Sequence, residues 1–403
     1  MAPSGVYAQP TPSPAVKQAF DLLMDRFVTP PSSAVILAGG WRGGVDHVNR
    51  TTGRAAGAPA PQFSGDRASD WDAFTASYSA LTAGPTSVDP AALDRAIVAG
   101  MAESLKSNDT YLVRDTASGV IGVRVTTDLV VIEVSAGGPA ESAGIRPGDQ
   151  IVAVDGTPVT TQSGGTERIR GPVGTPVELT LRRGGTDAAA QALATRTDAG
   201  FDWVEARVLG DGIGYLRLRQ WPATDAIPQF ESAISLLEQA GIRGLVIDVR
   251  NARGGAYATF ERIASRFIAT GPLYQRTNRQ GNTTTVSASG GTWSLQVPIL
   301  VLVDADTRSQ SELLAMALRE NAGASIVGAK TAGAVTGGNV FPLDDGTRLV
   351  VTTLQVRSGL GHEINGVGLE PDLPAPFDRN AAIDGRDSQL QTAVEFLRAK
   401  AGQ

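Results

Sequence analysis

Residues 304–317 read DADTRSQSELLAMA, so that two serines and a glutamate directly follow a run of apolar residues. Ser309 and Glu312 have the S-x-x-E spacing of a capping box, in which a serine begins a helix. The same place suits a serine nucleophile, because ligands collect at the carboxyl ends of strands in α/β sheets and a helix N-terminus stabilises negative charge. The spacing by itself favours the cap and leaves the nucleophile as the alternative.

A glycine loop follows a second apolar run, in the segment DVRNARGGAY at residues 248–257. Glycines at such a position let backbone N–H groups come close to another group. Gly254 and Gly255 are therefore candidates for an oxyanion hole, which stabilises the charge that develops when a nucleophile attacks a carbonyl. The alternative is a tight turn between a strand and a helix.

A third candidate site is the segment SGVIGV at residues 118–123, which enters an alternating strand. Backbone N–H groups of such a loop can hold the carboxylate of a chain terminus, while the bound peptide adds a strand to the sheet edge. The alternative is a small β-barrel without a ligand. The residues of this candidate peptide groove are Gly119, Val120, Ile121, Gly122 and Val123.

The first part of the chain, residues 1–108, is predicted to be a helical region with a flexible tail. Apolar residues have helical spacing at 13–28, 71–83 and 89–105, and the last of these segments begins with an Asp-Pro pair that is typical of a helix start. Residues 38–70 are rich in Gly, Ala, Pro and Arg and are predicted to form a long loop or insertion.

The pattern then changes twice. Residues 109–195 are predicted to form a compact β-rich module with one short helix, because alternating strands are separated by glycine turns. In residues 196–403, apolar strands alternate with helices, which predicts a core with a largely parallel sheet and right-handed crossovers. The fold class is therefore α/β, in a mixed α+β chain of several domains.

The composition restricts the possible functions. The 403 residues carry a net charge of −6 without a basic stripe, which disfavours nucleic acid as a partner. The absence of cysteine excludes disulfides, thiol catalysis and Cys-ligated zinc, and His47 and His362 are too few for a His-rich metal site. We therefore expect neither a metal nor an organic cofactor.

The chain has no run of eighteen apolar residues, the length that a membrane-spanning helix needs. It shows no intact signal peptide, because a charged segment followed by an apolar one is missing at its start. The segment SGVYAQPTPSP at residues 4–14 is either the remnant of a cleavage region followed by a linker or a disordered tail.

Taken together, these motifs resemble those of the C-terminal processing peptidases, which are serine proteases with an inserted PDZ domain. The resemblance runs from about residue 85 to residue 373, through the segments GGPAESAGIRPGDQIVAVDG, GLVIDVRNARGG, ADTRSQSELLAMALRENAGASIVGAKTAG and GHEINGVGLEPD. It implies a PDZ domain at residues 109–195 that binds the free C-termini of polypeptide substrates, before an α/β serine peptidase core. It also implies a location outside the cytoplasm, in the periplasm or cell envelope, and leaves the oligomeric state open.

Position by position, the family's nucleophile falls on Ser309, and the acidic residue that follows it falls on Glu312. Gly254, Gly255 and the amide of Gln310 take the positions of the oxyanion hole. The implied function is a serine-type endopeptidase that cleaves polypeptides through an acyl-enzyme on Ser309.

A serine nucleophile needs a general base, and the base is missing from the expected places. In the Ser–Lys branch of the family a lysine ends a T-F-G-K segment about 25 residues after the serine, whereas residues 331–334 read TAGA and place Ala334 there. Lys330 lies four residues earlier, roughly 13 Å away on an extended strand, and is a poor substitute.

The tricorn-like branch uses a histidine in a D-x-H-T pattern. In the segment LKSNDTYL, Thr110 matches the threonine, and the histidine position falls on Asp109, or on Asn108 if the alignment shifts. His47 lies in the predicted insertion and could reach the site, whereas His362 is expected at the surface. We therefore count Asp109 among the catalytic candidates and expect weak hydrolysis at neutral pH. The alternative function is a catalytically impaired homologue that binds peptides.

Overall fold

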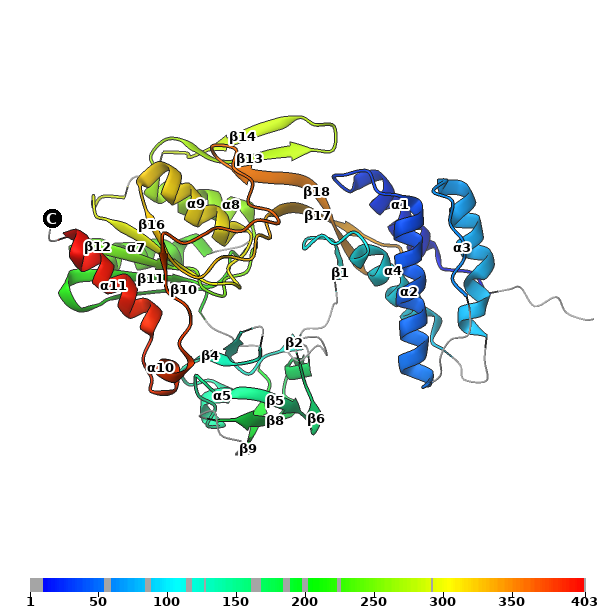
Figure 1. The fold of residues 1–403 in the computed structure, drawn as a ribbon, viewed down its shortest axis with the longest axis horizontal. Helices are drawn as coiled ribbons and strands as arrows, with labels where there is room; N and C mark the ends of the chain where they lie inside the picture. The colour runs from blue at the N-terminus through cyan, green and yellow to red at the C-terminus, as the bar shows by residue number, and fades with distance from the viewer. Residues whose placement is uncertain are drawn as a thin grey trace, which may run out of the picture. The chain divides into compact units, whose positions relative to one another are not determined.

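The computed structural model describes residues 10–53, 59–83, 88–113, 118–126, 128–160, 168–183, 189–197, 202–222, 226–290 and 293–401. The chain divides into two compact units (Figure 1). Residues 1–115, 276–284 and 336–355 form the first unit, and the rest of the chain forms the second. Residues 4–9 of the predicted tail lie outside the described ranges.

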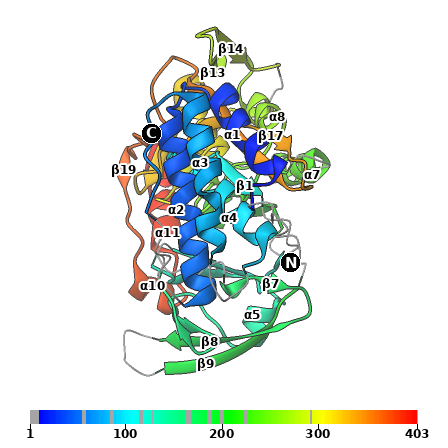
Figure 2. The ribbon, with the colours of Figure 1, turned by 90° about the vertical axis from the view of Figure 1, so that its right-hand side faces the viewer.

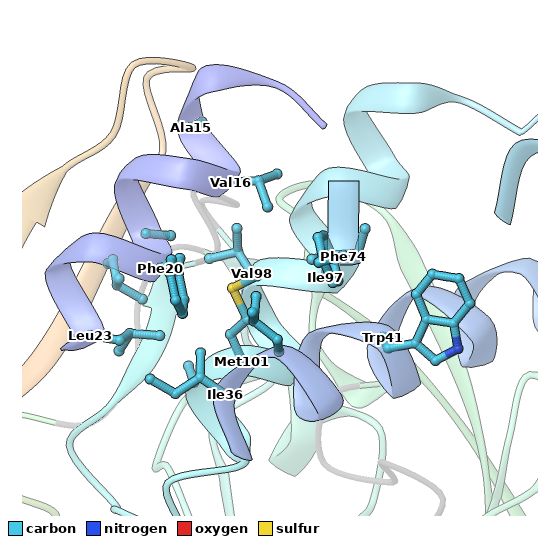
Figure 3. Close-up of a cluster of buried hydrophobic side chains, with 14 of the residues drawn as sticks. Ala15, Val16, Phe20, Leu23, Ile36, Trp41, Phe74, Ile97, Val98 and Met101 are labelled. Carbon is cyan, nitrogen blue, oxygen red and sulfur yellow. The ribbon is translucent and has the colours of Figure 1, made fainter. Parts of the chain in front are cut away.

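The first unit is built on the helices α1 (Pro14–Arg26), α2 (Ser33–Thr52), α3 (Arg67–Thr82) and α4 (Pro90–Glu103). α2 packs against α3 and α4 (Figure 2). Apolar side chains of all four helices meet in one buried cluster, which includes Phe20, Trp41, Phe74, Ile97 and Met101 (Figure 3). The helices predicted at 13–28, 71–83 and 89–105 are thus confirmed.

The prediction of a loop over residues 38–70 is wrong for residues 38–52, which belong to α2, and for residues 67–70, where α3 begins. The glycines of α2 lie where this helix meets α4. A Cβ atom on Gly43 would come within 2.4 Å of the carbonyl oxygen of Ala96, so only glycine permits this approach. Burial of Ile36 and Trp41 compensates for the low helix propensity of the glycines.

The second unit contains a six-stranded sheet whose strand order is β10-β11-β12-β15-β16-β19. All neighbouring pairs are parallel except β10 with β11. The parallel core predicted from the alternation of strands and helices is therefore present. The strands are β10 (Val204–Val208), β11 (Ile213–Leu218), β12 (Gly244–Asp248), β15 (Ile299–Val303), β16 (Ser325–Gly328) and β19 (Leu373–Pro374).

Helices cover this parallel sheet. Leu300 and Leu302 of β15 share a buried cluster with Ala393 and Leu397 of α11. Side chains alternate along a strand, so Val301 and the other intervening residues face the opposite side, where the crossover helices α8 and α9 pack together (Figure 1). These helices are α7 (Ala226–Gln239), α8 (Tyr257–Phe267), α9 (Gln310–Ala322) and α11 (Ser388–Ala401), and the short helix α10 (Arg379–Ile383) instead contacts Gly148 of the β-rich module.

The second unit also contains the predicted β-rich module, which has a buried cluster of its own around Ile121, Val131, Ile151 and Leu179. Its largest sheet has the order β6-β5-β8-β9, and the pairs β3–β4 and β2–β7 are separate. The elements are β2 (Ser118–Gly119), β3 (Val123–Val125), β4 (Val131–Val134), α5 (Pro139–Ser142), β5 (Gln150–Val154), β6 (Thr157–Pro158), β7 (Gly171–Pro172), β8 (Pro176–Arg182) and β9 (Ala189–Thr195).

One sheet was not predicted. Its strands follow the order β1-β18-β13-β14, with β17 paired to β18. Tyr111 of β1 is opposite Val350 of β18, so segments far apart in the sequence pair here. The strands are β1 (Tyr111–Val113), β13 (Pro272–Asn278), β14 (Thr283–Ser287), β17 (Thr336–Pro342) and β18 (Arg348–Ser358).

In the described part of the chain, no helix has both the length and the apolar character required to cross a membrane.

Candidate active site

Ser309 lies between the end of β15 and the first residue of α9, and is the N-cap residue of that helix. Its backbone has φ 60° and ψ −124°, a combination that L-residues rarely adopt. Such strain persists only where the surrounding structure enforces it, and it is concentrated at functional sites. Here the Thr307 hydroxyl donates to the carbonyl of Val249 at 2.9 Å, and the Arg308 N–H donates to the carbonyl of Ala252 at 3.2 Å.

The glycine loop after β12 comes directly against this serine. A Cβ atom on Gly254 would lie 2.6 Å from the Oγ of Ser309, and one on Gly255 would lie 2.1 Å from the carbonyl oxygen of Trp221. Neither position has room for a side chain. The Gly255 N–H donates to Oε1 of Gln310 at 2.7 Å, and Ser309 Oγ donates to the same oxygen at 2.9 Å. The fold thus brings together four of the predicted site residues, Ser309, Gln310, Gly254 and Gly255.

Glu312 is fully buried, and its carboxylate is surrounded by donors. It accepts the N–H of Ser309 at 3.1 Å, which is the Glu half of the predicted capping box. It also accepts the N–H groups of Gly333 at 2.8 Å and Ala334 at 2.9 Å, and the hydroxyl of Thr331. Glu312 therefore fixes the segment 331–334 beside the nucleophile helix, and acts as a positioning residue.

The lysine position of the Ser–Lys branch holds no ionisable group. Ala334 is buried, and its backbone N–H is already bound by Glu312. Lys330 forms an ion pair with Glu370 at 2.7 Å, and both side chains are more than half exposed. Lys330 is therefore a surface residue.

The remaining candidates for the base lie elsewhere in the chain. His47 belongs to α2 rather than to an insertion, and burial lowers its pKa, with Arg50 adding to the effect. His362 is 61% exposed, as predicted, and its Nδ1 lies 2.8 Å from Oε1 of Glu320. Asn108 is exposed.

Asp109 belongs to the first unit, where the hydroxyl of Thr336 donates to its Oδ2. Burial raises the pKa of Asp109, and the hydrogen bond from Thr336 opposes that shift. The neighbouring Thr110 donates to the hydroxyl of Thr352 at 3.0 Å and accepts the Thr352 N–H at 2.9 Å. A raised pKa makes Asp109 a stronger base than an ordinary aspartate once it is ionised.

An ionic cluster that the sequence pattern did not predict lies at the base of the glycine loop. Asp248, the last residue of β12, is fully buried and is bound by Arg217, Arg250 and the hydroxyl of Tyr215. Burial alone would raise the pKa of Asp248, but the two guanidinium groups outweigh it and hold the pKa well below its usual range. Arg250 also pairs with Asp387 at 2.6 Å. The cluster fixes the end of β12, from which the loop to Gly254 departs.

The predicted peptide groove lies at the edge of the β-rich module. Val120 donates its N–H to the carbonyl of Thr197 at 2.7 Å, and the carbonyl of Ile121 accepts the Ala140 N–H at 2.9 Å. Gly122 has φ 75°, which glycine adopts without strain. β3 pairs with β4 on one side, and the described residues provide no strand on its other side. That edge is available for an added strand.

The module also contacts the glycine loop. Arg124 of β3 donates to the backbone carbonyl of Asn251 at 2.5 Å and to its side-chain oxygen at 2.9 Å. Asn251 has φ 52°, a left-handed conformation that asparagine adopts more readily than most residues. Its amide group donates to the carbonyl of Val125 at 3.2 Å.

Among the described residues, no three His, Cys, Asp or Glu side chains are grouped as a metal site requires.

The comparisons with known proteins agree with this arrangement. A model of peptidase family S41 matches residues 212–375, and a PDZ domain model matches residues 130–183. A carboxyl-terminal-processing protease of Synechocystis sp. is 34% identical over 281 residues, which cover 68% of this chain and 65% of that protein. The carboxyl-terminal-processing protease of Picosynechococcus sp. is 34% identical over 294 residues, which cover 70% of both chains. The chain belongs to the carboxyl-terminal-processing protease family.

A further family member shows similar agreement. The chloroplastic C-terminal processing peptidase of Tetradesmus obliquus is 33% identical over 64% of this chain and 61% of its own length. The Synechocystis relative extends beyond the part that this chain matches, which is just under two thirds of its length.

Solved structures show the same fold. The photosystem II D1 C-terminal processing protease superimposes with a TM-score of 0.60 over 95% of this chain and 96% of its own, at 23% identity. Mature CPAF superimposes with a TM-score of 0.59 over 96% of this chain and 97% of its own, at 15% identity. The fold of the carboxyl-terminal-processing proteases therefore extends along nearly the whole chain.

Replacing Glu312 with glutamine tests its positioning role. The Glu312→Gln side chain keeps one oxygen acceptor and turns an NH₂ group toward backbone N–H donors, so buried donors lose their partner. We expect a loss of about 2–4 kcal/mol in the free energy of unfolding, measured by urea titration. The matched control is Glu370→Gln, whose side chain is 71% exposed and pairs with the exposed Lys330, and which should cost about 1 kcal/mol or less. Equal losses in both variants would contradict the role assigned to Glu312.

Proposed function

We propose that the chain is a serine-type endopeptidase that cleaves polypeptides through an acyl-enzyme on Ser309. The observation that carries this proposal is the strained backbone of Ser309 at the start of α9, with Gly254 in direct contact. The Ser309 hydroxyl bonds to Oε1 of Gln310, which also accepts the N–H of Gly255, so it lies beside the glycine loop. Backbone strain of this kind is concentrated at functional sites. Family membership supports the same assignment.

In the proposed reaction, Ser309 Oγ attacks the carbonyl carbon of the scissile peptide bond and loses its proton. The carbonyl oxygen becomes negatively charged and accepts hydrogen bonds from the backbone N–H groups assigned to the oxyanion hole, those of Gly254, Gly255 and Gln310. Expulsion of the amine leaves an acyl group on Ser309, and water then releases it. The N-terminus of α9 contributes to stabilising the negative charge.

The β-rich module is proposed to hold the C-terminus of the substrate on residues Gly119–Val123, with the peptide added to the free edge of β3. A cavity of about 1100 Å³ in the second unit is lined by Thr126 and Val130 of this module and by Asp304 to Asp306, just before Ser309. Its position suits a polypeptide that passes from the module toward the nucleophile. In this proposal residues 1–108 form the helical region, 109–195 the PDZ domain and 196–403 the peptidase core. Residues 109–113 depart from these bounds, because β1 pairs with β18 in the first unit.

The proposed partners are polypeptides with free C-termini, and the proposed location is outside the cytoplasm, in the periplasm or cell envelope. The support is the family to which the chain belongs, and the absence of a basic stripe, which disfavours nucleic acid. The Tetradesmus relative is named as chloroplastic.

Ser309→Ala should abolish hydrolysis of a denatured protein substrate, because the variant lacks the attacking oxygen. The cost in stability should be about 1 kcal/mol, since one hydrogen bond is lost. Gel analysis of substrate cleavage together with thermal unfolding separates the two effects. Unchanged hydrolysis by a folded Ser309→Ala variant would reject Ser309 as the nucleophile.

The second candidate function is peptide binding without hydrolysis, and the missing base favours it. Ala334→Lys would rebuild the Ser–Lys arrangement, and Asp109→His would rebuild the Ser–His one. If the base is the defect, one of these variants should raise the hydrolysis rate by about a hundredfold or more, the usual contribution of a positioned base. Ala332→Lys, two residues from Ala334, is the control for adding a charge to the same segment. Rapid cleavage by the wild type that His47→Ala abolishes would show instead that the base is His47.

The proposed peptide groove predicts a preference for free C-termini. Peptides that end in a carboxylate should bind at least about tenfold more tightly than the same peptides with a C-terminal amide, because the amide removes the charge-assisted hydrogen bonds. Fluorescence anisotropy with the Ser309→Ala variant measures binding without cleavage. Equal affinity for the two forms would show that residues Gly119–Val123 do not bind the terminal carboxylate.

A further inference from the structure

The side chain of Gln310 occupies an unusual place for the residue that follows a nucleophile. It is almost completely buried, and its Oε1 accepts two hydrogen bonds, from the N–H of Gly255 at 2.7 Å and from Oγ of Ser309 at 2.9 Å. A backbone N–H can only donate, so the Gln310 atom that faces Gly255 is the amide oxygen. A carbonyl oxygen of the chain itself therefore lies between the nucleophile and an assigned oxyanion donor.

This oxygen has the contacts that the carbonyl oxygen of a substrate needs. An oxyanion hole places its donors 2.7–3.1 Å from the reacting oxygen, and the Gly255 N–H lies within that range of Oε1. The hydroxyl proton of Ser309 is directed at the same atom, so the nucleophile and the donor are both engaged by one side chain.

A substrate carbonyl cannot enter beside Gln310. A single Cβ atom added to Gly254 would come within 2.6 Å of Oε1 of Gln310, of Cβ of Ser309 and of Oγ of Ser309. The space between the glycine loop and the serine is therefore filled by the Gln310 amide. Two oxygens cannot share the Gly255 N–H at full strength, because the donor has one proton.

We propose that the side chain of Gln310 occupies the oxyanion hole of the resting chain and has to leave before a substrate carbonyl can bind. The inference rests on the proposed function, since it takes Ser309 as the nucleophile and Gly255 as a donor. The fraction of molecules with Gln310 turned away then sets the apparent affinity for substrate. The chain is held in a latent state by two hydrogen bonds within its own active site.

Removing the side chain tests the proposal. In Gln310→Ala the Gly255 N–H and the Ser309 hydroxyl are released, while the backbone N–H of residue 310 remains. We expect kcat/KM on a denatured protein substrate to rise about tenfold, which corresponds to about 1.4 kcal/mol. The rate at which a fluorophosphonate probe modifies Ser309, with displacement of fluoride, should rise by a similar factor.

A neighbouring buried residue provides the matched control. Ser311 is fully buried in the same helix turn and accepts the indole N–H of Trp221 at 2.8 Å. Ser311→Ala therefore disturbs the start of α9 without emptying the space beside Gly255, and should accelerate neither reaction. Ser309→Ala gives the background of the probe reaction, and thermal unfolding confirms that each variant is folded.

A third measurement does not depend on turnover. The Gly255 amide should exchange its proton slowly in the wild type and in Ser311→Ala, and at least about tenfold faster in Gln310→Ala. Faster exchange together with faster labelling supports the proposal. Unchanged exchange of Gly255 in a folded Gln310→Ala variant, or labelling that stays the same or slows, would overturn it.

The outcomes also separate this inference from the proposed function. If Ser309 reacts with the probe but Gln310→Ala does not increase the labelling rate, the Gln310 side chain does not block the oxyanion hole. Ser309 then remains the assigned nucleophile. If no variant is labelled or cleaves protein, the proposed function fails, and the exchange of Gly255 still shows whether Gln310 occupies the hole.

Discussion

The carboxylate of Glu312 joins the first turn of α9 to residues 331–334, the segment that follows β16. It is buried and accepts hydrogen bonds from both segments, including the backbone N–H of Ser309. A buried charge is stable only with such partners, so the two segments cannot separate without leaving it unpaired. The backbone N–H of Ser309 and the positions of Gly333 and Ala334 are held by this one group.

A second buried carboxylate, that of Asp248, supports the glycine loop at the point where it leaves β12. Asp248 holds Arg217 and Arg250 at the carboxyl end of β12, and the two guanidinium groups keep its pKa low. Two buried carboxylates thus support the candidate site. Glu312 holds the start of α9 and residues 331–334, and Asp248 holds the start of the glycine loop. The geometry between Gly254 and Ser309 is fixed by charge pairing as well as by packing.

The sequence predicts those elements of the site that depend only on residues close to one another in the chain. The S-x-x-E spacing indicates the start of α9, and the run before it indicates β15, because capping and strand burial depend on neighbouring residues. The unusual φ of Ser309 and the contact between Gln310 and Gly255 could not be predicted, because they arise from the meeting of loops more than fifty residues apart. The helical state of the glycines in α2 could not be predicted for a related reason. Their contact partner, α4, comes later in the chain, and a glycine-rich composition is otherwise typical of loops. The pairing of β1 with β18 could not be predicted, because it joins segments more than two hundred residues apart.

The apolar cluster of the helices α1–α4 is completed by residues from much later in the chain. Leu343, Leu349 and Val351 belong to this cluster, and the N–H of Val28 donates to the carbonyl of Thr352 at 2.8 Å. A ribosome must therefore add roughly 250 residues after α4 before the helices can close their core, which takes roughly 10–50 s at ordinary rates of synthesis. Throughout that interval the nascent helices keep an apolar face uncovered, and this face is a natural target for chaperones that bind emerging chains.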